Sequence, residues 1–368
     1  MALRLHLIAV MLILCSLAHA EVITASMYTW PQPVQAPGAK GEAPVRLKVM
    51  VVAFDPIVKS QGGKRLHEVE KWNDPLEEAR QYVADLRRAS GGYVRYEIVE
   101  AVVYDGLPIM TDGYQYTPED YISDWAKRKP HQPEQVDFKV FATDKLRYPF
   151  NRKKTVAERV AAKEIDEVFC FSPPGAGAFY ESAMAGPRPF FINGSVFPCD
   201  ESKRNFAIMG FNYERGVDCM LENFCHRTEC CIRREYEGAS AKEKNNWQKF
   251  SSYDKIAPGE AGCGNCHFAP SSQRDYDWGN KTAVSTTCTD WYKNWPNLKG
   301  DKIIANCAEW GNGDMRLHHL WWLSHVPNRP GVNPDGKLNN WWRYIVDLDY
   351  NDTMHRKLLV LCQLIQEN

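Results

Sequence analysis

Three polar side chains at helical spacing offer the clearest chemistry in this sequence. Within residues 206–237, FAIMGFNYERGVDCMLENFCHRTECCIRREYE, Glu222, His226 and Glu229 follow one another at steps of four and three. On an α-helix such neighbours lie on one face, close enough to share a divalent metal ion. The same pattern also fits a solvated helix face, on which each such pair contributes roughly a few tenths of a kcal/mol. The sequence leaves both interpretations open.

The fragment LENFCH is close to the H-E-x-x-H helix of zinc proteases but does not match it. Glu222 stands where the first histidine should be, and Asn223 stands where the catalytic glutamate should be. A zinc site on this helix therefore needs ligands from elsewhere, and we expect His267 or His325 to complete it. Glu214 or Glu181 would then act as general base on the metal-bound water.

Residues 263–267, CGNCH, match the C-x-x-C-H motif that attaches c-type haem. In that interpretation Cys263 and Cys266 form thioethers and His267 binds the iron, with Met315 or a distant histidine as the sixth ligand. However, the motif lies in a Gly-rich turn without a helical haem fold around it. A disulfide or a pair of structural cysteines is the preferred interpretation.

A histidine-rich segment, RLHHLWWLSHVP, carries His318, His319 and His325. A helix here would turn two of the three toward one side. Each also fits a hydrogen-bonded core or surface histidine, so the segment is a candidate metal site only if it folds against the helix of residue 226.

Strands alternating with helices must position these residues. Runs of β-branched and aromatic residues predict strands, and amphipathic spacing predicts helices between them. This alternation predicts an α/β fold with a largely parallel sheet, in which ligands bind beyond the carboxyl ends of the strands. Asn212 is expected to cap the helix that begins near Val217. The predicted strands are 46–54, 93–104, 165–171 and 206–211, and the predicted helices are 74–89, 118–127, 155–163, 217 onward, 314–324, 337–347 and 353–366.

The second half differs in character. Nine of the 12 tryptophans lie from Trp247 to Trp342, among many Gly, Asn, Asp and Pro residues. We expect a loop-rich, disulfide-containing region at 239–368, packed on an α/β domain at 46–238. Most of these tryptophans should seal a core, but exposed ones would suit stacking on sugar rings.

The N-terminus predicts export. Arg4 precedes an apolar run to Leu17, and Ala18-His19-Ala20 provides an A-x-A cleavage site, so residues 1–20 read as a signal peptide and 21–45 as an extended leader. Eleven of the 12 cysteines would remain, and in an exported chain most should pair. The 45 basic and 46 acidic side chains give no support for nucleic-acid binding, and no later stretch is long and apolar enough for a membrane span.

Several phrases together resemble a family of exported proteins to which no established activity or fold is attached. They are FYESAMAGP, FAIMGFNYERGVDCMLENFCHRTE, AGCGNCHFAP, and WWLSHVPNRPG followed by KLNNWWRYIVD. The resemblance implies that these segments belong to one architecture. It implies no catalytic residue.

The sequence thus predicts a secreted or periplasmic metal-dependent hydrolase, with zinc, acting on an extracellular peptide or glycan. A non-catalytic glycan- or matrix-binding protein is the first alternative, and a haem electron-transfer protein is the second. The sequence does not indicate an oligomeric state.

Overall fold

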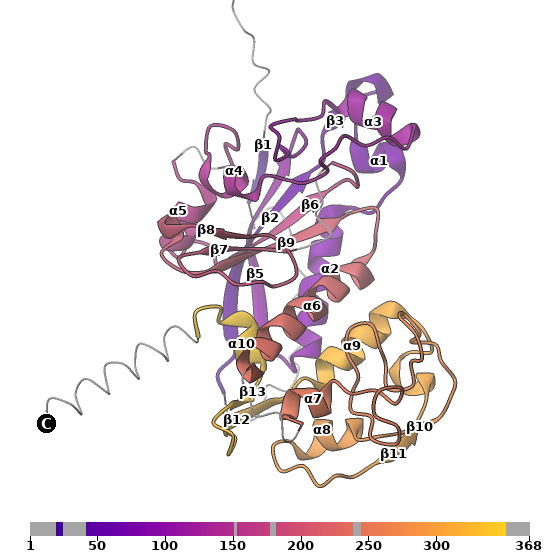
Figure 1. Cartoon of the computed structure of the whole chain (residues 1–368). Helices are drawn as coiled ribbons and strands as arrows, with labels where there is room; N and C mark the ends of the chain where they lie inside the picture. The colour runs from indigo at the N-terminus through magenta and orange to yellow at the C-terminus, as the bar shows by residue number, and fades with distance from the viewer. Residues whose placement is uncertain (1–19, 25–41, 151–152, 177–181, 238–243, 351–368) are drawn as a thin grey trace, which may run out of the picture.

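A seven-stranded sheet forms the centre of the protein (Figure 1). The structure is a computed structural model that describes residues 20–24, 42–150, 153–176, 182–237 and 244–350. Strands β5, β2, β6 and β9 run parallel, while β1 pairs antiparallel with β5 and β7 antiparallel with β9. The predicted α/β fold with a mostly parallel sheet is confirmed. In spatial order the strands are β1 (Ala20–Thr24), β5 (Val94–Tyr104), β2 (Val45–Phe54), β6 (Glu167–Ser172), β9 (Phe206–Asn212), β7 (Ala183–Gly186) and β8 (Val196–Pro198).

Strand β2 shows why the sheet is covered on both faces. Its residues 49–54 are fully buried, as expected for a near-continuous apolar run in a parallel sheet. Because side chains alternate along a strand, Val49 and Val51 enter one core cluster and Met50 and Val52 enter another. The sheet therefore separates two apolar layers.

Two long helices, α2 (Pro75–Ala89) and α6 (Val217–Tyr236), contribute to the first layer. Asp74 caps α2 by accepting hydrogen bonds from the amides of Leu76 and Glu77. By contrast, the predicted cap of α6 is wrong. Asn212 ends β9, and Gly216, which has no side chain to cap with, occupies the N-cap position before α6. The opposite layer contains α4 (Phe138–Thr143) and α5 (Val156–Ala161).

A third, smaller apolar cluster lies beside the sheet. It joins short elements of the first half, including residues that follow β2 and β5. Its members include residues of β3 (Ile57–Val58), α1 (Leu66–Glu70) and α3 (Pro118–Ala126), and β4 (Lys64–Arg65) pairs with β3.

The second half lies against α2 and α6, mainly through α9 (Figure 1). Six of its eight buried tryptophans, at 247, 291, 295, 322, 341 and 342, belong to the same cluster as the first sheet layer. The predicted helix 337–347 is only partly found, because a strand precedes its short helix. The elements are α7 (Asn246–Phe250), β10 (Val284–Thr286), α8 (Cys288–Asn294), β11 (Ile303–Ala305), α9 (Met315–His325), β12 (Asn328–Val332), β13 (Leu338–Asn340) and α10 (Trp342–Val346).

The ten cysteines within the described residues are all free thiols, so the predicted disulfides are not found in this part of the chain. Residues 1–19 of the predicted signal peptide (1–20) and the predicted helix 353–366 lie outside the described residues. No helix in the described part of the chain combines the length and apolarity that a membrane crossing requires.

Candidate metal centre

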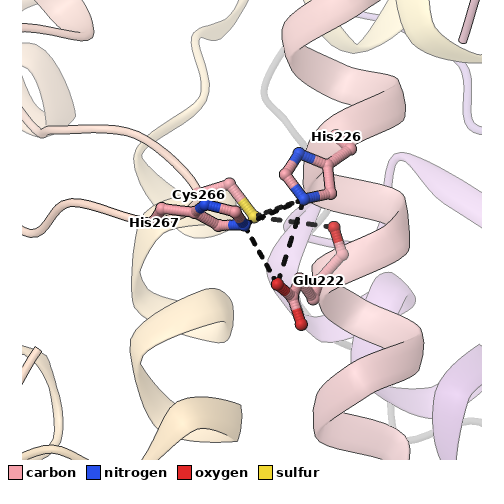
Figure 2. A group of neighbouring side chains, drawn as sticks. All are labelled: Glu222, His226, Cys266 and His267. Carbon is pink, nitrogen blue, oxygen red and sulfur yellow. Dashed lines mark hydrogen bonds and ion pairs between the residues drawn. The ribbon is translucent and has the colours of Figure 1, made fainter. Parts of the chain in front are cut away.

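Four side chains from two segments meet at the junction of the two halves (Figure 2). Glu222 and His226 extend from successive turns of α6. Cys266 and His267 come from the loop between α7 and β10 and point toward them. One ligand atom from each lies within 4.8 Å of all the others. The structure therefore brings together three residues that the sequence predicted as ligands, and adds Cys266.

The distances within this group suit one tetrahedral ion. The Nε2 atom of His267 lies 3.0 Å from Oε1 of Glu222 and 3.1 Å from Nε2 of His226. Nε2 of His226 lies 3.9 Å from Oε1 of Glu222 and 3.8 Å from Sγ of Cys266. Zinc bonds to nitrogen, oxygen and sulfur set ligand–ligand spacings of about 3.3–3.6 Å in a tetrahedron. Small adjustments would therefore complete a zinc shell.

Each imidazole is held from behind by a carboxylate. Oε2 of Glu229 lies 3.1 Å from Nδ1 of His226, and Oδ1 of Asp275 lies 3.0 Å from Nδ1 of His267. A carboxylate accepts, so each Nδ1 carries a proton, and in the neutral ring each Nε2 has a lone pair that faces the other ring. Two lone pairs 3.1 Å apart repel unless a cation lies with them. Carboxylates behind metal-binding histidines are a regular feature of zinc sites.

In the absence of a metal, a proton can take that place. Burial disfavours the charged form of His226, but hydrogen bonds with Cys266 and Glu229 outweigh it and raise its pKa to about 10. Burial also disfavours charge on Glu222, but hydrogen bonds from His267 and Tyr276 lower its pKa below the usual range. The Tyr276 hydroxyl donates to Oε1 of Glu222 at 3.0 Å. Glu222 is thus an ionised ligand that faces a cationic position.

Tight backbone packing places Cys266 and His267 against α6. A Cβ atom on Gly264, whose φ is +74°, would lie 2.0 Å from the carbonyl oxygen of Phe268, so only glycine fits this turn. The amide of Cys266 donates to Oε1 of Glu229 at 3.0 Å. The indole of Trp322 donates to the carbonyl of Gly264 at 3.0 Å. The Gly-rich turn therefore holds this loop of the second half against the polar face of α6.

A pocket of about 230 Å³ opens beside the group. It lies where β9 ends and α6 begins, which is the position predicted for a binding site beyond the carboxyl end of a strand. Asn212 lines it with 5% of its surface exposed, and neither side-chain amide atom has a partner among the described residues. The other lining residues are Asn193, Gly210, Phe211, Arg215, Gly216, Cys219, Met220, Glu222, Asn223, His226 and Tyr276.

Other predicted site residues lie elsewhere. Glu229 supports His226 from behind instead of joining the four. His325 is turned away, with Nδ1 2.7 Å from the carbonyl of Trp321. Glu214 pairs with Arg215 at 3.4 Å and does not line the pocket, although burial raises its pKa. Glu181 lies outside the described residues.

The sequence did not indicate Cys266 as a metal ligand, nor Asp275 and Tyr276 as its neighbours. Cys266 was assigned to haem or a structural pair because its motif suggested those roles first. The adjacent His267 was the usable signal, since two ligand types in consecutive positions can reach one ion from a tight turn. Asp275 and Tyr276 stand in a loop without any pattern that marks them.

The CGNCH motif does not fit covalent haem. Cys263 is fully buried and Cys266 is 1% exposed, and neither lines the pocket. His267 is turned toward Glu222 and His226.

The tryptophans of the second half are less exposed than stacking on sugar rings would require. Eight of the nine, from Trp247 onward, are buried, and Trp321 is partly buried.

No protein-family model matches the chain, and neither a curated protein nor a solved structure matches it.

Proposed function

We propose that the protein is an exported, zinc-dependent hydrolase that acts on an extracellular peptide or glycan. Glu222 and His226, which line the pocket, are ligands together with His267 and Cys266, which do not. The observation that carries this proposal is the pair of imidazoles whose Nε2 atoms face each other at 3.1 Å while each Nδ1 is held by its own carboxylate. That arrangement prepares two neutral ring nitrogens for a metal ion.

The pocket supports a catalytic use of the ion over a purely structural one. Glu222 and His226 belong to the pocket wall and keep 14% and 22% of their side chains exposed. Structural zinc sites are closed by their four ligands, whereas catalytic sites leave a coordination position for water or substrate. With four protein ligands here, water or substrate would add a fifth position on the pocket side. A substrate in this pocket would contact the ion from that side.

The pocket wall also has groups for orienting a polar substrate. The carboxamide of Asn212 has both a donor and an acceptor to offer. Arg215 adds a positive charge, and Tyr276 adds a phenol that burial and the charge of Glu222 keep protonated by raising its pKa. Such groups suit a carboxylate, an amide or a sugar hydroxyl.

Bound zinc would polarise the scissile carbonyl or lower the pKa of its water. Glu222 is the only acidic residue of the described chain that lines the pocket. Its Oε1 faces the proposed metal position, so its second oxygen, Oε2, would accept the proton of the attacking water. Tyr276, already a donor to Glu222, can turn its hydroxyl to the developing oxyanion. Glu181 remains a predicted base.

The test compares zinc content and hydrolysis of a peptide and glycan panel. The purified wild type should contain at least about one zinc per chain. Glu222→Gln and His226→Ala should each lower this content by at least one equivalent and abolish hydrolysis. Glu77→Gln and His131→Ala are matched controls, since Glu77 pairs with Arg80 on α2 and His131 pairs with Asp112. Unchanged zinc content in both site variants, with folding intact by circular dichroism, would reject the site.

A further inference from the structure

A second group of ligand atoms lies directly behind the first, in the interior. Cys225, Cys266 and His319 place two sulfurs and one ring nitrogen within 4.8 Å of one another. All three are buried, with exposed fractions of 0% for Cys225 and His319 and 1% for Cys266. Cys266 belongs to both groups.

Separate elements supply these three residues. Cys225 precedes His226 on α6, and its thiol is hydrogen-bonded with that of Cys266. His319 comes from α9, which packs along α6. Its Nδ1 lies 3.3 Å from the carbonyl oxygen of Asp218, a group that only accepts. Nδ1 therefore carries the proton, and Nε2 offers its lone pair to Cys266 Sγ at 3.9 Å.

The surroundings of this second group exclude water. The Trp278 ring lies 5.2 Å from that of His319, and its indole nitrogen donates to the carbonyl of Cys266. Two thiols and an imidazole without a carboxylate form a soft donor set, which selects Zn²⁺ or Cu⁺ and not Mg²⁺ or Ca²⁺.

The sulfur of Cys266 lies between two imidazoles. It is 3.8 Å from Nε2 of His226 in the first group and 3.9 Å from Nε2 of His319 in the second. A thiolate has enough lone pairs to bind two ions at once.

We propose that Cys225, Cys266 and His319 form an inner site for a thiophilic d¹⁰ ion, and that the Cys266 thiolate bridges it to the outer ion. Loading of the centre releases two thiol protons to solvent, one from Cys225 and one from the shared Cys266, and the inner ion forms two sulfur–metal bonds and one nitrogen–metal bond. The bridge rests on the proposed outer zinc, whereas the inner site rests on its own three ligands. The protein would thus contain a two-metal centre with one ion facing the pocket and one enclosed.

The experiment measures metal per chain. The full-length protein is stripped with a chelator under reductant, reconstituted anaerobically with Zn²⁺ alone, freed of excess metal and analysed for zinc. The wild type should hold two ions, and His319→Ala should hold one. The double variant Glu222→Gln/His267→Ala should also hold one. Cys170→Ala, which removes a fully buried thiol on β6 in the other core layer, should keep two.

Titration with Co²⁺ tests the inner site without any substitution. Thiolate-to-cobalt charge-transfer absorption should grow through two equivalents in the wild type and through one in Cys225→Ser. The same reconstitution with Cu⁺ tests the alternative ion. One Cu⁺ bound per chain of the Glu222→Gln/His267→Ala double variant would support the inner site.

The outcomes separate the two proposals. One zinc in the wild type that persists in His319→Ala would overturn the inner site and leave the outer one. One zinc that is lost in His319→Ala but kept in the outer double variant would support the inner site and reject the hydrolase. The inner site would also be overturned if Cys225 and Cys266 formed a disulfide in the purified protein and no second ion bound after that disulfide was reduced.

Discussion

At the scale of single residues, Glu229 shows how a side chain can serve a metal centre without touching the ion. One carboxylate oxygen holds Nδ1 of His226, and the other accepts the amide of Cys266. Glu229 therefore orients one ligand from each of the two segments that meet here. Its spacing on α6 suggested a ligand, because spacing along a helix cannot tell a ligand from the group behind a ligand.

Glu229→Gln should weaken zinc binding by about 10- to 100-fold, because the amide no longer favours the tautomer of His226 that binds metal. Competition with a chromogenic chelator measures the change. Asp275→Asn is the matched comparison at His267, and its effect should be smaller because the Asp275 side chain is 54% exposed. Equal zinc affinity for wild type and Glu229→Gln would contradict the assigned role.

Glu78 on α2 is a buried acid whose two carboxylate oxygens have no partner within the described ranges. Burial, with added repulsion from Asp218 and Glu214, raises its pKa from 4.5 to about 9. Between these two pH values the folded protein keeps a proton that the unfolded chain has released. Stability should therefore fall as pH rises, by up to about 1.4 kcal/mol per pH unit.

Glu78→Gln should remove that slope. Urea unfolding from pH 5.5 to pH 8 should show the variant gaining stability over the wild type as pH rises. The neighbouring Glu77→Gln should follow the wild type, because Glu77 is a surface residue paired with Arg80. Parallel curves for Glu78→Gln and the wild type would refute the raised pKa.

At the scale of elements, α6 is fixed to the sheet by a buried ion pair. Two guanidinium nitrogens of Arg227 donate to the two carboxylate oxygens of Glu167 on β6 at 2.7 and 2.6 Å. Arg227 also donates to the carbonyl of Ile345 in α10. Since Arg227 follows His226 directly, this pair sets the rotation of α6 and thereby the direction of the metal ligands.

Glu167→Ala should reduce the free energy of unfolding by about 3–5 kcal/mol, because it leaves the Arg227 charge buried and unpaired. Equilibrium denaturation measures the loss. Glu77→Ala, which breaks the surface pair with Arg80, should cost less than about 1 kcal/mol. Similar losses for both variants would mean that the buried pair does not fix α6.

The sequence predicted the secondary-structure elements better than the long-range contacts between them. Strand and helix patterns located β2, α2, β5, β6, β9 and α6 to within a few residues, because apolar periodicity records burial directly. The sequence prediction failed at Asn212, because a side chain that suits a helix cap equally suits a pocket wall. The approach of residue 267 to α6 depends on Gly264 and Trp322, whose contacts are long-range and leave no periodic signal.

At the scale of the whole molecule, the two-metal centre would join three parts of the chain. Glu222 and His226 belong to α6, Cys266 and His267 to the loop before β10, and His319 to α9. The loop lacks regular secondary structure from residue 251 to residue 283. Its position depends on side-chain contacts with α6 and on single hydrogen bonds such as that from Trp322. The contact of this loop and α9 with α6 is called the seam between the halves. Metal ligation would therefore stabilise this seam more than it stabilises the sheet.

Removal of metal should loosen that seam selectively. Ligand binding stabilises the state that binds, by about 4 kcal/mol when free zinc exceeds Kd a thousandfold. Hydrogen exchange followed by mass spectrometry should show faster exchange in peptides spanning 262–278 and in α9 after chelation, with β2 and β6 unchanged. The metal-site variant Glu222→Gln/His226→Ala should show the fast pattern with or without zinc. If chelation instead accelerated exchange equally in the sheet, metal would support the entire fold, and the seam would not be a separate unit of stability.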